Sequence, residues 1–190
     1  MDTYHVVLYL HFLSLFVGVG AGSTLLVALI KLRGAETVAD AAPWGMLAGQ
    51  VEKAFPVAVL GLFGSGAYMT SDVWTWSTGW IEVSIVGLVL VALQGPLVGG
   101  RAGHRLKHAL MENGPGALSA KTRVLARHPG LWVTECTNLA LVFGIVWNMT
   151  QKPSTGSAIV TLVVAYVAGA AVAWPFTRLA DAPAAAAETA

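Results

Sequence analysis

The chain has 190 residues, of which 56% are hydrophobic and 11% are charged, and its formal net charge at pH 7 is +1. The charged share is about half that of an ordinary soluble domain, which excludes a water-soluble globular protein and predicts an integral membrane protein in a lipid bilayer. The low net charge argues against nucleic acid as a partner. The single cysteine, Cys136, excludes an intramolecular disulfide and a CxxC motif.

Five stretches of the chain predict membrane-spanning helices, and together they predict an all-α bundle. The first, residues 6–30, has no formally charged residue, and at about 1.5 Å per residue it is longer than the roughly 30 Å hydrocarbon core. The other four cover residues 54–70, 81–99, 131–150 and 157–176. We therefore expect a single transmembrane helical domain over residues 1–180, with a four-helix core plus one further span, and a flexible tail at residues 181–190.

The connections between these spans differ in character. Residues 31–53 alternate polar and apolar side chains, which suits a short helix lying at the membrane interface. Three tryptophans between residues 74 and 80 are typical of an aromatic belt at the water boundary. Near the end of the third span, Pro96 predicts a kink whose freed backbone carbonyls need a protein or water partner.

Small residues at helical spacing occur in every span. Lipid tails are as apolar as the helix surfaces, so the hydrophobic effect does not drive helices together within a bilayer. They associate instead through close backbone contact at such small residues. Each of these pairs is therefore a candidate helix contact, although such spacing also arises by chance in a chain rich in Gly and Ala. The candidate positions are Gly18 and Gly22, Gly61 and Ser65, Gly95 and Gly99, Ala140 and Gly144, and Ala165, Gly169 and Ala173.

Basic residues lie almost entirely on one side of the predicted spans. Residues 101–128 hold six Lys or Arg, whereas the connection between the last two spans holds only Lys152. Because Lys and Arg accumulate in cytoplasmic loops, this asymmetry predicts an N-terminus outside and a C-terminus in the cytoplasm of a bacterial inner (plasma) membrane.

Two histidines in the basic connection have a spacing that could form a metal site. His104 and His108 are four residues apart, so on a helix both rings could hold one metal ion. Arg105 and Lys107 lie between them and disfavour a cation, which favours a solvated basic face near anionic lipid headgroups.

Polar residues inside the spans form two layers. An ionisable group at membrane depth suggests a functional site, but Glu82 and Glu135 are also close enough to water to snorkel, and Glu135 could pair with an Arg. The layer nearer the outside contains His11, Met69, Glu82, Asn148 and Met149, and the layer nearer the cytoplasm contains Gln94, Glu135, Cys136 and Asn138.

His11 is the only histidine inside an apolar span. Its ring nitrogens need a partner there, which is either an ordinary interhelical hydrogen bond or a ligand or proton. Met69 and Met149 are expected at a similar depth, and imidazole with thioether suits copper(I) or haem iron. We therefore predict His11, Met69 and Met149 as candidate cofactor-binding and metal-binding residues for haem b or copper.

The first span begins LHFLSLFVGVGAG, in which His11 is followed by Gly18, Gly20 and Gly22, and WNMTQKP occupies residues 147–153. These stretches resemble small bacterial membrane proteins of the copper-resistance protein D (CopD)-like superfamily, and the second resembles an uncharacterised branch of it. Distant relatives include the HemJ-type protoporphyrinogen oxidases, four-helix haem proteins with a functional first-span histidine. The resemblance implies that role for His11. Gly18 and Leu26 replace a tryptophan and an arginine of the HemJ pattern, so it implies copper or haem binding rather than porphyrinogen oxidation.

Three functions remain open on the sequence. The first is a haem-binding or copper-binding membrane protein, with a redox role and His11 as ligand. The second is a non-catalytic membrane subunit or scaffold of a larger complex or homo-oligomer. The third is a small ion or solute transporter that uses Gln94, Glu135 and Asn138 beside Pro96. No GxSxG, HExxH, P-loop or dinucleotide motif is present. The sequence leaves open whether the protein is an enzyme.

Overall fold

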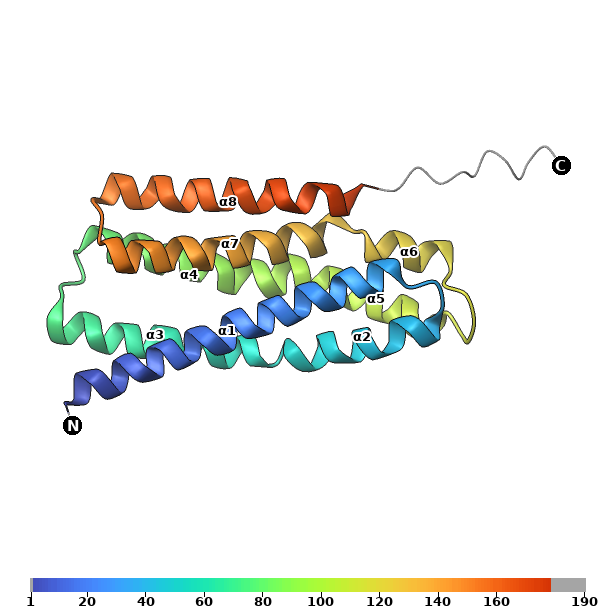
Figure 1. Cartoon of the computed structure of the whole chain (residues 1–190), viewed down its shortest axis with the longest axis horizontal. Helices are drawn as coiled ribbons and strands as arrows, with labels where there is room; N and C mark the ends of the chain where they lie inside the picture. Colours follow the sequence, from blue (N-terminus) through green and yellow to red (C-terminus); the bar gives the residue numbers. More distant parts are fainter. Residues whose placement is uncertain (1, 179–190) are drawn as a thin grey trace.

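The computed structural model describes residues 2–178, which form a bundle of helices (Figure 1). These residues contain no β-strand, and Thr37 and Ala117 form an isolated bridge. The helices are α1 (Thr3–Gly34), α2 (Val38–Val51), α3 (Ala54–Val73), α4 (Gly79–Gln94), the π-helix η1 (Gly95–Gly100), α5 (Arg101–Glu112), α6 (Ala120–Ala126), α7 (Pro129–Gln151) and α8 (Thr155–Thr177).

Five helical stretches within the described residues are long and apolar enough to cross a membrane, which confirms the predicted all-α bundle of five spans. The stretches are Thr3–Gly34, Val38–Val73, Gly79–Glu112, Ala120–Gln151 and Thr155–Thr177. Each predicted span lies within one of them, whereas the tail predicted at residues 181–190 lies outside the described residues. Large apolar side chains such as Phe16 and Leu60 are 70% and 72% exposed, as expected for surfaces that face lipid.

The bundle consists of two helix groups. α1 packs mainly on α3, while α7 packs on both α4 and α8. Small residues bring the helices together in each group: a Cβ at Gly18 would lie 3.3 Å from Ala58, and one at Gly144 would lie 3.0 Å from Ala165. The predicted positions Gly18, Gly144 and Gly169 therefore do lie at helix contacts.

At one end, the helices continue past the thickness of a bilayer. The α1–α2 connection (residues 35–37) and the α5–α6 connection (residues 113–119) lie at this end, which we call the basic end (Figure 1). α3 has 20 residues, about 30 Å, and so spans the hydrocarbon core by itself, whereas α1 has 32 residues, about 48 Å. The end of α1 together with α2, α5 and α6 therefore forms a helical extension.

The extension shares a packed core with the adjoining ends of α7 and α8. Trp132 is fully buried, its indole N–H donates to the Ala126 carbonyl at 2.9 Å, and its ring stacks on Phe176 with centroids 4.6 Å apart. Leu29, Leu32 and Leu106 belong to the same cluster. Burial of these side chains stabilises the extension in the same way as the core of a small soluble domain.

The structure corrects the expectation about the first connection. Residues 31–53 do not form a helix lying at the interface: α2 begins with a capping box at Thr37, continues the line of α3 and packs on α1 (Figure 1). At Pro96, where a kink is expected, the helix changes to the π-helix η1, and the chain continues from η1 directly into α5. Proline and π-helical turns are both common at irregular points of a helix.

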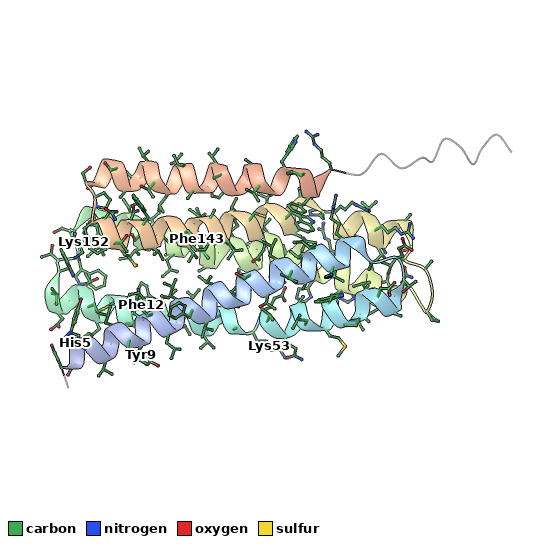
Figure 2. The ribbon with its side chains drawn as sticks, viewed as in Figure 1. His5, Tyr9, Phe12, Lys53, Phe143 and Lys152 are labelled. Carbon is green, nitrogen blue, oxygen red and sulfur yellow. The ribbon has the colours of Figure 1, made fainter. Side chains whose placement is uncertain are left out.

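The opposite end carries the aromatic residues predicted for a belt. Trp74 and Trp80 meet edge to face with centroids 5.5 Å apart. The Lys152 ammonium lies 4.7 Å from the centre of the Trp74 ring, and Lys152 and His5 both lie at this end in Figure 2. A cation on an indole face links the α3–α4 and α7–α8 connections.

Candidate functional site

His11 lies inside the α1–α3 pair, as predicted for a buried histidine. Its side chain is 6% exposed, and its Nδ1 lies 2.9 Å from Ser65 Oγ. The Ser65 hydroxyl donates its only hydrogen to the carbonyls of the preceding turn of α3, at Gly61 and Leu62. When the Ser65 hydroxyl donates to one of those carbonyls, Ser65 Oγ accepts from His11 Nδ1–H and the neutral ring has its lone pair at Nε2. Such a nitrogen can accept a proton or bind a metal ion.

The two methionines predicted with His11 lie in different helix groups. Met69 is one turn beyond Ser65 on α3 and is half-buried. Met149 packs on the α4–α7–α8 cluster of Leu141, Ile145 and Leu162. No group of three or more His, Cys, Asp or Glu suited to a metal ion occurs in the part of the chain that the structure describes. The three-residue ligand set thus stays a prediction.

Glu135 is the most enclosed carboxyl inside a span. It is 6% exposed on α7 and faces Gly22 of α1, where a Cβ would lie 3.2 Å from Glu135 Oε1. The ion pairs found within residues 2–178 join His5 to Asp2 and Lys121 to Glu112, both at the surface. Among residues 2–178, Glu135 therefore forms no ion pair with an Arg.

A network of polar side chains surrounds the same part of α7. Gln94 of α4 donates to Thr137 Oγ1, and Tyr166 of α8 donates to Gln94 Oε1 at 3.3 Å. Thr137 in turn donates to the Val133 carbonyl at 2.6 Å. This network joins α4, α7 and α8, so Gln94 has a structural role at the predicted inner layer.

Two buried oxygens beside this network have no hydrogen-bond partner within residues 2–178: Thr134 Oγ1 and Asn138 Oδ1. Both residues face η1, since a Cβ at Gly99 would lie 2.9 Å from Thr134 and one at Gly95 would lie 3.9 Å from Asn138. Buried polar atoms are nearly always paired, so these two oxygens indicate a place between α7 and η1 that a water molecule or another donor would fill.

The remaining predicted polar residues have simpler surroundings. Glu82 is exposed in the first turn of α4, near the opposite end. Asn148 is fully buried and its Nδ2 donates to the Ala158 carbonyl at 3.2 Å, which fastens α7 to the start of α8. Cys136 is a buried free thiol on α7, in the core cluster that α7 shares with the extension.

Sequence reasoning did not single out Glu52, which lies at the break between α2 and α3. Glu52 ends α2 and is exposed, and a Cβ at Gly103 of α5 would lie 3.7 Å from its Oε1. The sequence feature that could have identified Glu52 is its position immediately before Lys53, where the predicted second span begins.

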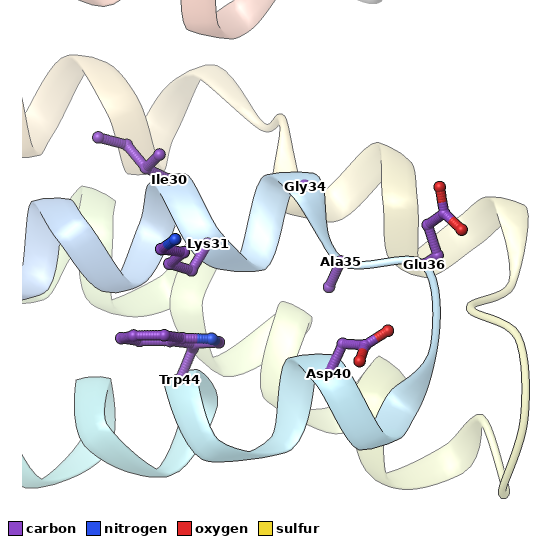
Figure 3. A pocket seen from close by; sticks show the side chains of 7 residues that line it. All are labelled: Ile30, Lys31, Gly34, Ala35, Glu36, Asp40 and Trp44. Carbon is purple, nitrogen blue, oxygen red and sulfur yellow. The ribbon is translucent and has the colours of Figure 1, made fainter.

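Two open depressions lie at the basic end. The first, of about 550 Å³, lies between α1 and α2, and Figure 3 shows the Lys31 amine above the Trp44 ring there, at 5.8 Å from the ring centroid. The second, between α5 and α6, is lined by His104 and His108 together with basic residues. Neither is lined by His11 or Glu135, so the two buried sites are distinct from these surface depressions.

No protein-family model, curated protein sequence or solved structure matches this chain. The resemblance to CopD-like proteins therefore stays a prediction based on short motifs, and function has to be argued from the sites themselves.

Proposed function

We propose that this multi-pass membrane protein is a small ion transporter, or an ion-coupled solute transporter, whose proton-binding group is Glu135. The observation that carries the proposal is a carboxyl that is 6% exposed and has no cationic partner within residues 2–178. Glu135 lies six residues into α7, about 9 Å along the helix from its start. Ionisable side chains kept at such depth commonly mark proton or ion pathways.

The neighbouring groups suit the same chemistry. Within five residues of α7, Glu135 offers a carboxylate toward α1, and Thr134 and Asn138 offer hydroxyl and amide oxygens toward η1; oxygen atoms of these kinds bind small cations such as Na⁺. The facing segment of the third span is η1, a π-helix. π-helical turns are frequent at functional sites, and irregular backbone at membrane depth is typical of transporter binding sites.

The site is tested by a pH titration of the infrared spectrum of the protein in lipid. We expect a carboxylic-acid band that titrates in the wild-type protein, is absent in Glu135→Gln and is unchanged in the matched control Glu82→Gln. Absence of any titrating band assigned to Glu135, over the pH range in which the protein stays folded, would overturn the proposal.

Transport is tested in liposomes that contain a trapped pH-sensitive dye and carry an inside-negative potential. We expect the wild type and Glu82→Gln to admit protons faster than protein-free liposomes, and Glu135→Gln to match the protein-free rate. Repeating the assay with Na⁺ in place of K⁺ tests competition at the same oxygens. Without a Glu135-dependent flux under any of these conditions, the protein is better described as the non-catalytic subunit or scaffold of a larger membrane complex.

A second candidate function is haem or copper binding at His11, with Met69 and Met149 as the further ligands considered. The observation that favours it is the hydrogen bond from His11 Nδ1–H to Ser65, because metal-binding histidines are usually oriented by a partner on the other ring nitrogen. The test is an absorption spectrum with metal analysis of gently solubilised protein, compared with His11→Ala. A Soret band or stoichiometric copper lost in His11→Ala supports it, and absence of both in the wild type rejects it.

We also propose that the basic end faces the cytoplasm of a bacterial inner membrane, with the N-terminus outside. The support is the concentration of Lys and Arg in residues 101–128 against Lys152 alone at the opposite connection. A single cysteine introduced at His108, in a Cys136→Ser background, should resist a membrane-impermeant maleimide in intact cells. Rapid labelling in intact cells would reverse the orientation.

A further inference from the structure

We propose that the depression between α1 and α2 binds the headgroup of an aminophospholipid, a phosphodiester that carries a primary ammonium group. The depression has a volume of about 550 Å³ and lies at the basic end. It is lined by a cation, an aromatic ring and two carboxylates. None of these residues belongs to the Glu135 site, so the inference stands independently of the proposed function.

A contact between α1 and α8 places this depression at the membrane surface. α8 has 23 residues, about 35 Å, which is only slightly longer than the roughly 30 Å hydrocarbon core, so its last turn lies at the boundary. The Arg33 guanidinium lies 5.8 Å from the centre of the Phe176 ring in that last turn. Lys31 and Gly34, which line the depression, are within one helical turn of Arg33 on α1. The depression therefore lies at the level of the lipid headgroups, which extend about 5–8 Å beyond the core on each side.

The cation in the depression is Lys31. Its ammonium group lies 5.8 Å from the centre of the Trp44 ring, and Figure 3 shows the two side chains one above the other. This cation–π contact holds the ammonium group at the edge of the depression. The ion pairs within residues 2–178 lie elsewhere, so Lys31 has no carboxylate partner there. An ammonium group at headgroup level that lacks a carboxylate attracts a lipid phosphate.

The two carboxylates lie at the other end of the depression (Figure 3). Glu36 belongs to the α1–α2 connection, Asp40 belongs to the first turn of α2, and both are exposed. Asp40 Oδ2 accepts hydrogen bonds from the backbone N–H and the hydroxyl of Thr37, at 3.2 and 2.7 Å, which fixes this carboxylate and leaves Oδ1 for a ligand. Neither carboxylate pairs with a cation within residues 2–178. A primary ammonium group would supply both the charge and the hydrogen bonds.

The order of these groups matches the order of groups along a phospholipid. α1 runs toward the α1–α2 connection and α2 runs back from it, so Ile30 and Trp44 lie on the bilayer side and Glu36 lies on the water side (Figure 3). Ile30 is 44% exposed, as suits a side chain beside lipid tails. A lipid whose tails lie along Ile30 would place its phosphate near Lys31 and its ammonium group near Glu36 and Asp40.

The same groups discriminate between lipid classes. Phosphatidylglycerol has a phosphate but no cation, so Glu36 and Asp40 would repel it. Phosphatidylcholine ends in a quaternary ammonium group, which has no N–H to donate to a carboxylate and binds best on an aromatic face. The face of Trp44 is already covered by Lys31. Phosphatidylethanolamine is therefore the lipid that satisfies both ends of the depression.

The site is tested by native mass spectrometry of the full chain in detergent, with dioleoyl forms of these three lipids added in turn. We expect the wild type to bind one phosphatidylethanolamine at least about tenfold more tightly than either other lipid, because one charge-assisted hydrogen bond is worth about that factor. Lys31→Gln and Glu36→Gln should each weaken this binding about tenfold, and Glu36→Gln should also strengthen the binding of phosphatidylglycerol.

Two further variants separate the depression from its surroundings. Gly34 lines the depression and a Cβ there would meet nothing within 4 Å, so Gly34→Leu should fill the space and weaken phosphatidylethanolamine binding without removing a charge. Lys53→Gln is the matched control. Lys53 is an exposed lysine at the start of α3 and does not line the depression, so this variant should keep the wild-type affinity.

Equal affinity for the three lipids, or tighter binding of phosphatidylglycerol, would overturn the proposal. Phosphatidylethanolamine binding that is unchanged in both Lys31→Gln and Glu36→Gln would do the same. Glycerophosphoethanolamine, which has the headgroup but no tails, should bind at least about tenfold more weakly; equal binding would indicate a soluble ligand instead of a lipid. The substituted positions are exposed, and thermal unfolding checks that each variant keeps its fold.

Discussion

The contact between α7 and α8 at Gly169 gives a test of how closely the spans pack. A Cβ at residue 169 would lie 2.7 Å from the Cys136 carbonyl oxygen and from the Cα of Thr137, both of which belong to backbone. Ordinary contact begins at 3.4 Å, so Gly169→Ala must move the two helices apart by about 0.7 Å. Overpacking of this kind costs about 1–3 kcal/mol, partly offset by the roughly 0.5–1 kcal/mol that alanine contributes within a helix.

We therefore expect Gly169→Ala to lose about 1–2 kcal/mol, which is roughly a 5-fold to 30-fold change in the unfolding equilibrium constant. The assay is reversible unfolding in mixed micelles with increasing SDS, followed by circular dichroism. Gly64→Ala is the matched control, because Gly64 is also inside a spanning helix but nothing lies within 4 Å of a Cβ there. If Gly169→Ala were as stable as Gly64→Ala, the close approach of α7 and α8 would be refuted.

Three further substitutions test individual contacts. Trp132→Phe removes the indole N–H that donates a 2.9 Å hydrogen bond, and should cost about 1–2 kcal/mol in the same SDS titration; an unchanged midpoint would contradict the buried bond. Ser65→Ala removes the acceptor of His11 Nδ1–H, so the ¹⁵N resonances of the His11 ring should shift toward mixed tautomers, and unshifted resonances would contradict the assignment. Gly22→Ala places a methyl group 3.2 Å from Glu135 Oε1, so the infrared band of Glu135 should shift, whereas an unchanged band would place that carboxyl elsewhere.

Hydropathy was sufficient to predict the five spans because each is long, apolar and nearly free of charge. It could not predict that α2 continues α3. Residues 31–53 are amphipathic, and an amphipathic helix can rest on lipid headgroups or on other helices with the same sequence pattern. The deciding contacts, such as the packing of Trp44 against the extension core, come from residues distant in the sequence.

The depth of the polar residues could be predicted from topology, but their partners could not. Counting residues placed His11 and Glu135 inside the membrane, and both are buried. Their partners depend on how each helix is rotated about its own axis. The spacing of small residues indicated this rotation only at some positions. Ser65 was singled out as a packing position and also proved to be the acceptor for His11, whereas Glu52 was treated as part of a connection.

The two buried sites share one face of α1, and this has a mechanical consequence. His11 and Gly22 are eleven residues apart, which is close to three full turns, so both point toward the interior at a separation of about 16 Å. At His11 that face meets α3, its main partner, whereas at Gly22 it meets α7 of the other helix group. The contact between the two groups within the membrane therefore includes the Glu135 carboxyl. In the proposed transporter, protonation of Glu135 would therefore act at this contact, because a charged and a neutral carboxyl differ strongly in their cost of burial. Alternating-access transporters couple ion binding to the movement of one helix group against another.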